Sequence, residues 1–127
     1  MQVKNLIRQL PWHPDGVWGE RKIHEINKIV VHQTQANSTF ETINRYHISP
    51  GVNNHISQRG CPHICYHFGI REDGEVIQAN DLEHVVWHTK SENRYGVSIA
   101  HHGNFKGLGH EIGDDPTKVY LLLKESL

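Results

Sequence analysis

The side chains best suited to chemistry in this sequence are histidines that follow or interrupt short apolar runs. His32 closes a β-branched run that begins at Lys28, which is typical of a buried strand. Open α/β sheets form their ligand crevices at the carboxyl ends of such strands. A histidine there can bind a metal ion or transfer a proton near neutral pH. The chain contains 12 histidines, and this excess favours one of those two roles.

Two later segments carry further candidate residues. Residues 64–71 predict a second strand with Tyr66 on one face, and residues 86–89 place His88 between Trp87 and Thr89. A single tyrosine or histidine in such a position is more often a packed core residue with a satisfied polar atom. The combined order and spacing of the three segments favours one shared site.

The first half of the chain predicts the elements that position these residues. Residues 1–27 are expected to form an irregular arm that packs Trp12 and Trp18 on the body. Ser38 and Glu41 match a capping box, from which a helix of about ten residues is expected to run to about His47.

The second half continues the alternation of strands and helices. Asp73-Gly74 predicts a hairpin turn that leads into an antiparallel strand at 75–78. A short helical turn is expected over 81–85 and a buried strand over 95–100. Asp115-Pro116 begins a last helix, which reaches the end of the chain without a stop signal.

Composition excludes several classes of protein. A length of 127 residues fits one domain, and a formal net charge of −1 argues against a dedicated nucleic-acid binder. No apolar run approaches the length of a membrane span, and residues 1–10 contain no secretory signal. The spacing of Cys61 and Cys65 is poor for a stabilising disulfide.

Taken together, these segments resemble the zinc-dependent N-acetylmuramoyl-L-alanine amidases, a type that includes phage amidase-lysozymes, and the related peptidoglycan recognition proteins. The resemblance covers roughly residues 28–127. The matching pieces are Ile29–His32, Tyr66–Ile70, Asp73-Gly74, Val76–Gln78, Trp87–Thr89, Asn93, Gly96–Ile99 and Gly103–Phe105. The resemblance implies an α/β fold with a central mixed β-sheet flanked by helices on both faces. Residues 1–27 would be an N-terminal arm and residues 28–127 an amidase-like domain.

The resemblance also implies a reaction and a set of roles. The chain would cleave the amide between N-acetylmuramic acid and L-alanine in peptidoglycan, as a bacterial or phage protein that acts on the cell wall. His32 matches the family's first zinc ligand, and Tyr66 matches a tyrosine that assists catalysis beside the metal. His88 and Asn93 match residues that line the groove for the peptide. Nucleic acid and membrane are not expected as partners.

The resemblance ends before the zinc site is complete. The family takes its second and third ligands, a His and then a Cys or Asp, from beyond the helix that begins here at Pro116. We therefore expect a C-terminally truncated domain that binds zinc weakly and has little amidase activity. The chain would be a fragment of a longer amidase, a short relative that binds peptidoglycan without cleaving it, or a protein with local substitute ligands. The candidate substitutes are His101, His102 and His110.

A second, local metal site is also conceivable. His63, Cys65 and His67 alternate along the predicted strand, so their side chains would share one face. The competing interpretation, a buried small cysteine beside a surface histidine, is favoured because short His/Cys patterns often mislead.

Overall fold

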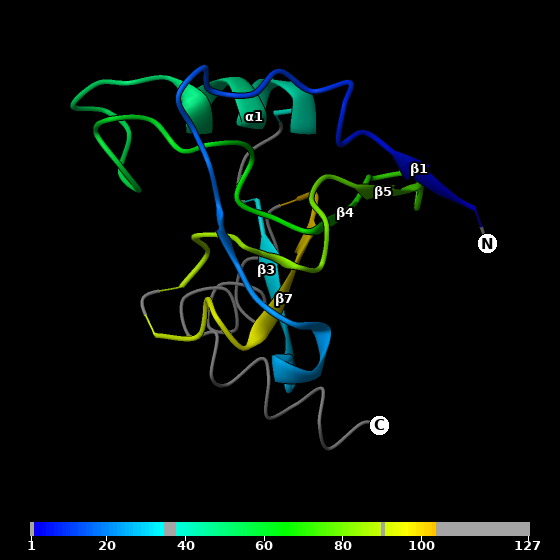
Figure 1. Cartoon of the computed structure of the whole chain (residues 1–127). Helices are drawn as coiled ribbons and strands as arrows, with labels where there is room; N and C mark the ends of the chain where they lie inside the picture. Colours follow the sequence, from blue (N-terminus) through cyan, green and yellow to red (C-terminus); the bar gives the residue numbers. More distant parts are fainter. Residues whose placement is uncertain (1, 35–37, 90, 104–127) are drawn as a thin grey trace.

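The computed structural model describes residues 2–34, 38–89 and 91–103. Their main feature is a five-stranded sheet in the order β1-β5-β4-β7-β3 (Figure 1). Strands β4 and β5 are antiparallel, and the other neighbours are parallel, which confirms the predicted mixed sheet. The strands are β1 (Val3–Asn5), β3 (Lys28–Gln33), β4 (Phe68–Ile70), β5 (Val76–Gln78) and β7 (Gly96–His101).

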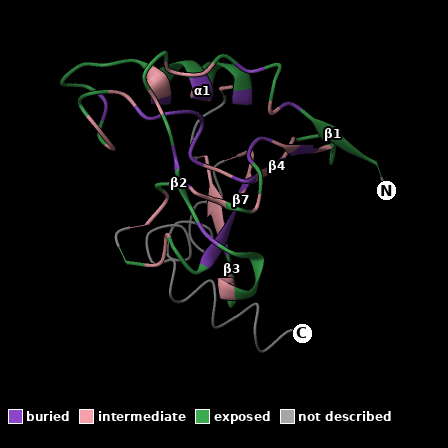
Figure 2. Ribbon diagram, in the orientation of Figure 1, coloured by how far each residue is buried: buried purple, intermediate pink, exposed green. Residues whose placement is uncertain are grey.

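The longest strands, β3 and β7, form the parallel pair that carries the site. Their register runs from Lys28 opposite Gly96 to Gln33 opposite His101. Val30 and Ala100 are buried in this pair, and β7 is the most continuously buried strand in Figure 2. Both strands agree with the sequence prediction because β-branched and apolar runs favour a buried parallel strand.

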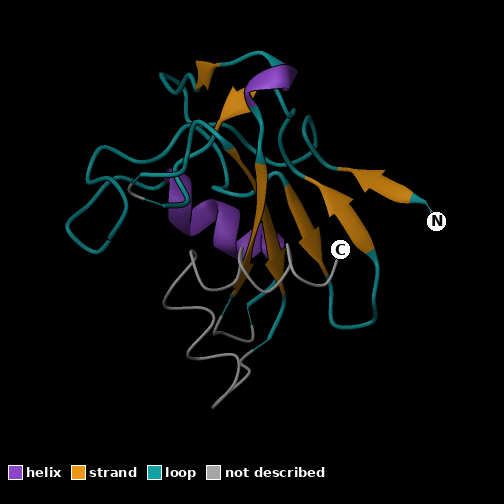
Figure 3. Ribbon diagram, turned by 90° about the horizontal axis from the view of Figure 1, so that it is seen from below, coloured by secondary structure: helices purple, strands orange, loops and turns teal. Residues whose placement is uncertain are grey.

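Helix α1 (Phe40–Ile48) covers one face of the sheet, as the view in Figure 3 shows. Its N-cap is Thr39, whose hydroxyl accepts a hydrogen bond from the Thr42 amide at 3.1 Å. The predicted capping box at Ser38 is therefore wrong by one residue, and Glu41 forms an ion pair with Arg71 instead. Either hydroxyl residue can cap a helix, so composition alone does not choose between neighbours.

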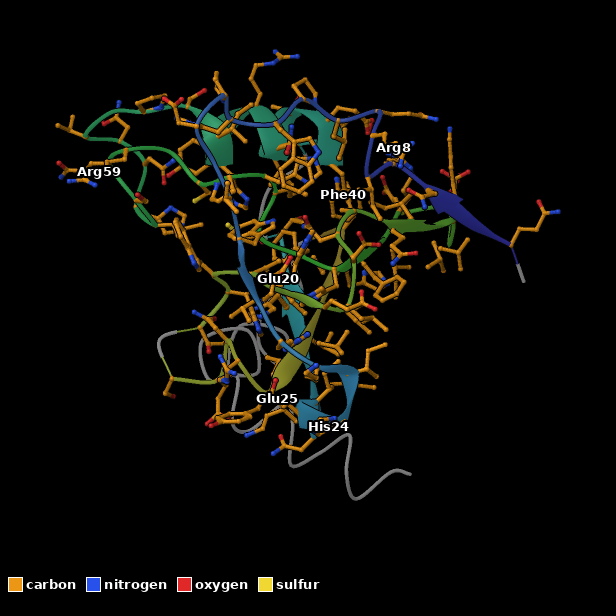
Figure 4. The ribbon with its side chains drawn as sticks, viewed as in Figure 1. Arg8, Glu20, His24, Glu25, Phe40 and Arg59 are labelled. Carbon is orange, nitrogen blue, oxygen red and sulfur yellow. The ribbon has the colours of Figure 1, made fainter. Side chains whose placement is uncertain are left out.

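The buried face of α1 consists of Phe40, Asn44 and His47, at the i, i+4 and i+7 spacing of one helical stripe. Phe40 lies between the helix and the sheet (Figure 4). Its ring lies directly over Gly69 of β4, where a Cβ atom would stand 2.6 Å from Phe40 Cζ. The close approach of helix and strand therefore requires glycine at this position.

The predicted strand at 64–71 is wrong in its first half, because only Phe68–Ile70 joins the ladder. The backbone before it is held by side chains from other elements. Ile64 N–H donates to Asn44 Oδ1 at 2.8 Å, and Asn80 Nδ2 donates to the carbonyls of Ile64 and Tyr66 at 2.7 Å each. The expected alternation of faces holds over 65–70, where Cys65, His67 and Gly69 are buried and Tyr66, Phe68 and Ile70 are half-buried, but it does not extend to Ile64, because residues 61–65 are all buried.

The segment at 1–27 is more regular than the predicted arm. Besides β1, it contains β2 (Gly19–Glu20), which pairs with β6 (His84–Val85), and the 3-10 helix η1 (Ile23–Glu25). The predicted helical turn at 81–85 is a single turn followed by β6. Trp18 is 3% exposed, as expected for an anchor on the body. The division into an arm and a domain stays a prediction.

The helix expected from Asp115-Pro116, and with it the second flanking helix of the predicted fold, lies outside the described residues, as does His110. Among the residues that are described, no helix has the length and apolar character needed to cross a membrane.

Candidate functional site

A groove of about 810 Å³ opens beside the carboxyl end of β3. His32 and Tyr66 line this groove, together with Trp87, His88 and Asn93 from the loop after β6. The other wall consists of side chains from α1 and the loop that follows it: Thr42, Ile43, Tyr46, His47, His55 and Ile56. The structure thus brings together all four residues that the sequence assigned to a site.

His32 and His88 contact each other in this groove. His32 Nε2 lies 2.9 Å from His88 Nδ1, within hydrogen-bond distance. Burial lowers the pKa of His32 to about 4 and that of His88 to about 2, so both rings are neutral at neutral pH. The other ring nitrogen of His88 is buried and has no partner among the described residues.

Tyr66 supplies the groove with a hydrogen-bond donor. Its ring centroid lies 5.9 Å from that of His32, and burial raises the pKa of its phenol to about 12. The phenol therefore keeps its proton throughout the neutral range. Among the described residues no hydrogen bond occupies the hydroxyl, which leaves it available to a ligand.

Asn93 has a different geometry from the one expected of a simple contact residue. Its Oδ1 accepts hydrogen bonds from the amides of His88 at 2.9 Å and Thr89 at 2.7 Å. The side-chain oxygen thus fixes the loop that carries His88. These hydrogen bonds use the side-chain oxygen of Asn93 and not its side-chain nitrogen.

Sequence reasoning missed two residues that shape the site. Arg21 is 5% exposed. Its guanidinium donates hydrogen bonds to the backbone carbonyls of Leu82, Asn93, Arg94 and Gly96, and these bonds fix the loop that carries His88. His47 lies 5.7 Å from Tyr66 between ring centroids, and its Nδ1 accepts from the Cys65 amide at 3.1 Å. The only signal for His47 was its spacing of seven residues from Phe40 on the predicted helix.

The local metal candidates do not gather around one point. His63 contacts Asn80 and the Leu10 carbonyl, while His67 accepts from the Ser98 amide at 3.0 Å and donates to the His84 carbonyl at 2.8 Å. Cys65 is buried, and its burial raises the pKa of the thiol. In the described part of the chain, no three His, Cys, Asp or Glu residues could hold an ion together. The favoured interpretation is confirmed for Cys65, which is buried, and wrong for His63, which is fully buried and not at the surface.

The two proposed substitute ligands that the structure describes, His101 and His102, do not line the groove. His102 lines a separate small cavity with Thr39, Phe40 and Arg71.

The sequence matches the family profile of N-acetylmuramoyl-L-alanine amidases over residues 22–121, and the chain belongs to this family. No protein of curated function matches the sequence.

Solved structures show the same fold. N-acetylmuramoyl-L-alanine amidase LysC from Clostridium intestinale URNW is 24% identical with a TM-score of 0.61, over 100% of this chain and 78% of that one. The Ph2119 endolysin from the Thermus scotoductus MAT2119 bacteriophage Ph2119 is 24% identical with a TM-score of 0.67, over 98% and 77% of the two chains. Peptidoglycan recognition protein-LE, solved in complex with tracheal cytotoxin, is 19% identical with a TM-score of 0.66, over 83% and 62%.

The family is generally zinc-dependent. A hydrolytic zinc site needs about three protein ligands and one open position. Of the described residues, only His32 was predicted from the resemblance to be a ligand, and its Nε2 lies 2.9 Å from His88 Nδ1. No three His, Cys, Asp or Glu side chains among the described residues could hold an ion together. The described residues by themselves therefore do not fit a hydrolytic zinc centre.

Proposed function

We propose that this chain acts on the bacterial cell wall by binding peptidoglycan in the groove and serving cleavage of the amide between N-acetylmuramic acid and L-alanine. His32 keeps its predicted role as first zinc ligand, and His88 and Asn93 keep theirs as contacts of the stem peptide. The observation that supports the proposal most is the free Tyr66 hydroxyl beside His32, in a groove of about 810 Å³. A phage or bacterial origin agrees with this role.

The contribution of Tyr66 follows from its protonation. Attack on an amide carbonyl places negative charge on the carbonyl oxygen, and a fixed O–H donor stabilises that charge more than it stabilises the starting amide. With a pKa of about 12, the Tyr66 phenol is a donor at every neutral pH. The neutral His88 ring can position the peptide without adding charge.

The test is the pair of variants Tyr66→Phe and His88→Ala, assayed on purified cell wall with added zinc. We expect Tyr66→Phe to lower the release of L-alanine amino termini by about a hundredfold or more, because one lost oxyanion donor typically costs that much. Its retention on cell wall in a pull-down should stay nearly intact. His88→Ala should weaken both release and retention, since it contacts the peptide throughout.

The alternative function is a module that recognises peptidoglycan without cleaving it. It is favoured because no three His, Cys, Asp or Glu side chains in the described part of the chain could hold a metal ion together. Retention of the wild-type chain on cell wall with no new amino termini would support this module and refute the amidase proposal. No retention at all would refute both.

A further inference from the structure

Aromatic and imidazole rings form a continuous file along the groove. The ring centroids of His32 and His88, at the end of the file where the reaction is proposed, are 5.1 Å apart, and the other neighbouring ring centroids are 5.7–5.9 Å apart. The order of the rings is His88, His32, Tyr66, His47, Tyr46 and His55. The file thus extends past the residues assigned to the reaction, onto the last turn of α1 and the loop after it.

The far end of the file is exposed, whereas its middle is not. Tyr46 is 38% exposed and His47 is 4% exposed. The Tyr46 and His55 rings are stacked with an interplanar angle of 20°. Both line the same groove as His32 and Tyr66. A ligand that reaches from the reaction end would therefore meet this aromatic pair.

The Tyr46 hydroxyl is already used inside the protein. It donates to the Asn53 carbonyl at 2.6 Å and lies 2.7 Å from His55 Nδ1, and the His55 amide donates to it at 3.2 Å. These contacts fix the loop against the end of α1. What the pair offers to a ligand is therefore the apolar ring surface in a fixed orientation, not a free hydroxyl.

The proposed substrate has two chemically different sides. One side of the scissile amide is a peptide with carboxylates, and the other is a sugar whose pyranose ring presents C–H groups on its faces. The negative face of an aromatic ring attracts such C–H groups. The same negative ring face offers a carboxylate-bearing peptide no comparable attraction.

From these observations we infer that Tyr46 and His55 form a saccharide-binding subsite for the pyranose ring next to the scissile amide. This inference rests on the proposed function. It also orients the substrate: the glycan lies toward α1, and the peptide lies along Trp87, His88 and Asn93 on the opposite wall.

The experiment compares Tyr46→Leu with Tyr46→Phe. Both variants lose the hydroxyl contacts to Asn53 and His55, but only the leucine variant loses the ring. Two ligands are used: a disaccharide carrying the stem peptide, and the same peptide with an acetyl group in place of the sugar. Dissociation constants are measured by calorimetry with a chelator present, and thermal melting confirms that each variant is folded.

We expect Tyr46→Leu to bind the sugar-bearing ligand about two- to tenfold more weakly than Tyr46→Phe, the range for a lost aromatic contact. Affinity for the sugar-free peptide should be the same in both. His55→Ala, the second variant, should show the same selective loss. Equal affinities of the leucine and phenylalanine variants for the sugar-bearing ligand, or equal losses for both ligands, would overturn the subsite alone. Failure of the wild type to bind either ligand would instead refute the proposed function, and the subsite with it.

Discussion

Replacing Asn80 with leucine should destabilise the fold more than any surface change, because one buried amide serves four partners. Asn80 is fully buried. Its Nδ2 donates to the carbonyls of Ile64 and Tyr66, and its Oδ1 accepts from Trp18 Nε1 at 2.9 Å and contacts His63 Nδ1 at 3.1 Å. Leucine has a similar size but can make none of these bonds.

The magnitude follows from the groups that lose their partner. The carbonyls of Ile64 and Tyr66, the Trp18 N–H and His63 Nδ1 would each lose a partner, and each group left buried and unsatisfied costs roughly 1–3 kcal/mol. Partial relaxation toward water lowers the sum, so we expect a loss of about 3–6 kcal/mol. That is a large share of the ~5–15 kcal/mol by which native domains are stable.

Urea unfolding of the wild type, Asn80→Leu and Asn80→Asp measures this loss. The aspartate variant keeps the acceptor for Trp18 but cannot donate to the two carbonyls, so it should also be strongly destabilised. Asn27→Leu is the matched control, because Asn27 is exposed and should change stability by less than about 0.5 kcal/mol. A loss below about 1 kcal/mol for Asn80→Leu would refute the assignment of this amide as the organiser of residues 63–66.

Two further predictions concern the pH response and the groove wall. Burial lowers the pKa of both His47 and His67 from 6.5 to about 4. The unfolded chain therefore takes up protons first as pH falls, and the free energy of unfolding should be flat above pH ~6.5 and drop by about 1.4 kcal/mol per pH unit per histidine down to pH ~4. Denaturant unfolding across this range checks the slope, and a flat profile would contradict it. Arg21→Lys should release the loop that carries His88, since lysine lacks the forked donors; we expect a loss of about 2 kcal/mol or more in thermal unfolding, and weaker cell-wall binding. Unchanged cell-wall binding would show that Arg21 does not fix the loop that carries His88.

Local patterns were sufficient to predict the strands and the helix that frame the site. β3 and β7 carry apolar, β-branched runs, and α1 has a capping hydroxyl before it and a proline after its end. The placement of His32 and Tyr66 on one groove followed from the family resemblance and holds in the structure. These features depend on residues that are close in sequence, or on a shared motif order.

The features that sequence reasoning missed depend on contacts across the chain. β1 is a three-residue exposed strand with no apolar alternation, and only its pairing with β5 defines it. The strand predicted through Ile64 fails because its backbone partners are the side chains of Asn44 and Asn80, which are 20 and 16 residues away. The exposed pair of Tyr46 and His55 likewise forms only when the loop after α1 folds back.

The failed strand also explains how Tyr66 comes to face the groove. A regular strand would alternate Cys65 and Tyr66 between opposite faces, and its ladder would set their directions. Here side-chain amides and the His47 ring take the place of that ladder, and they hold Cys65 buried and the Tyr66 ring with its centroid 5.9 Å from that of His32. The orientation of the proposed donor is thus set by Asn80 and His47, neither of which needs to touch substrate. Substitutions at these two positions should therefore alter the site by moving Tyr66, and the fold and the site share one set of hydrogen bonds.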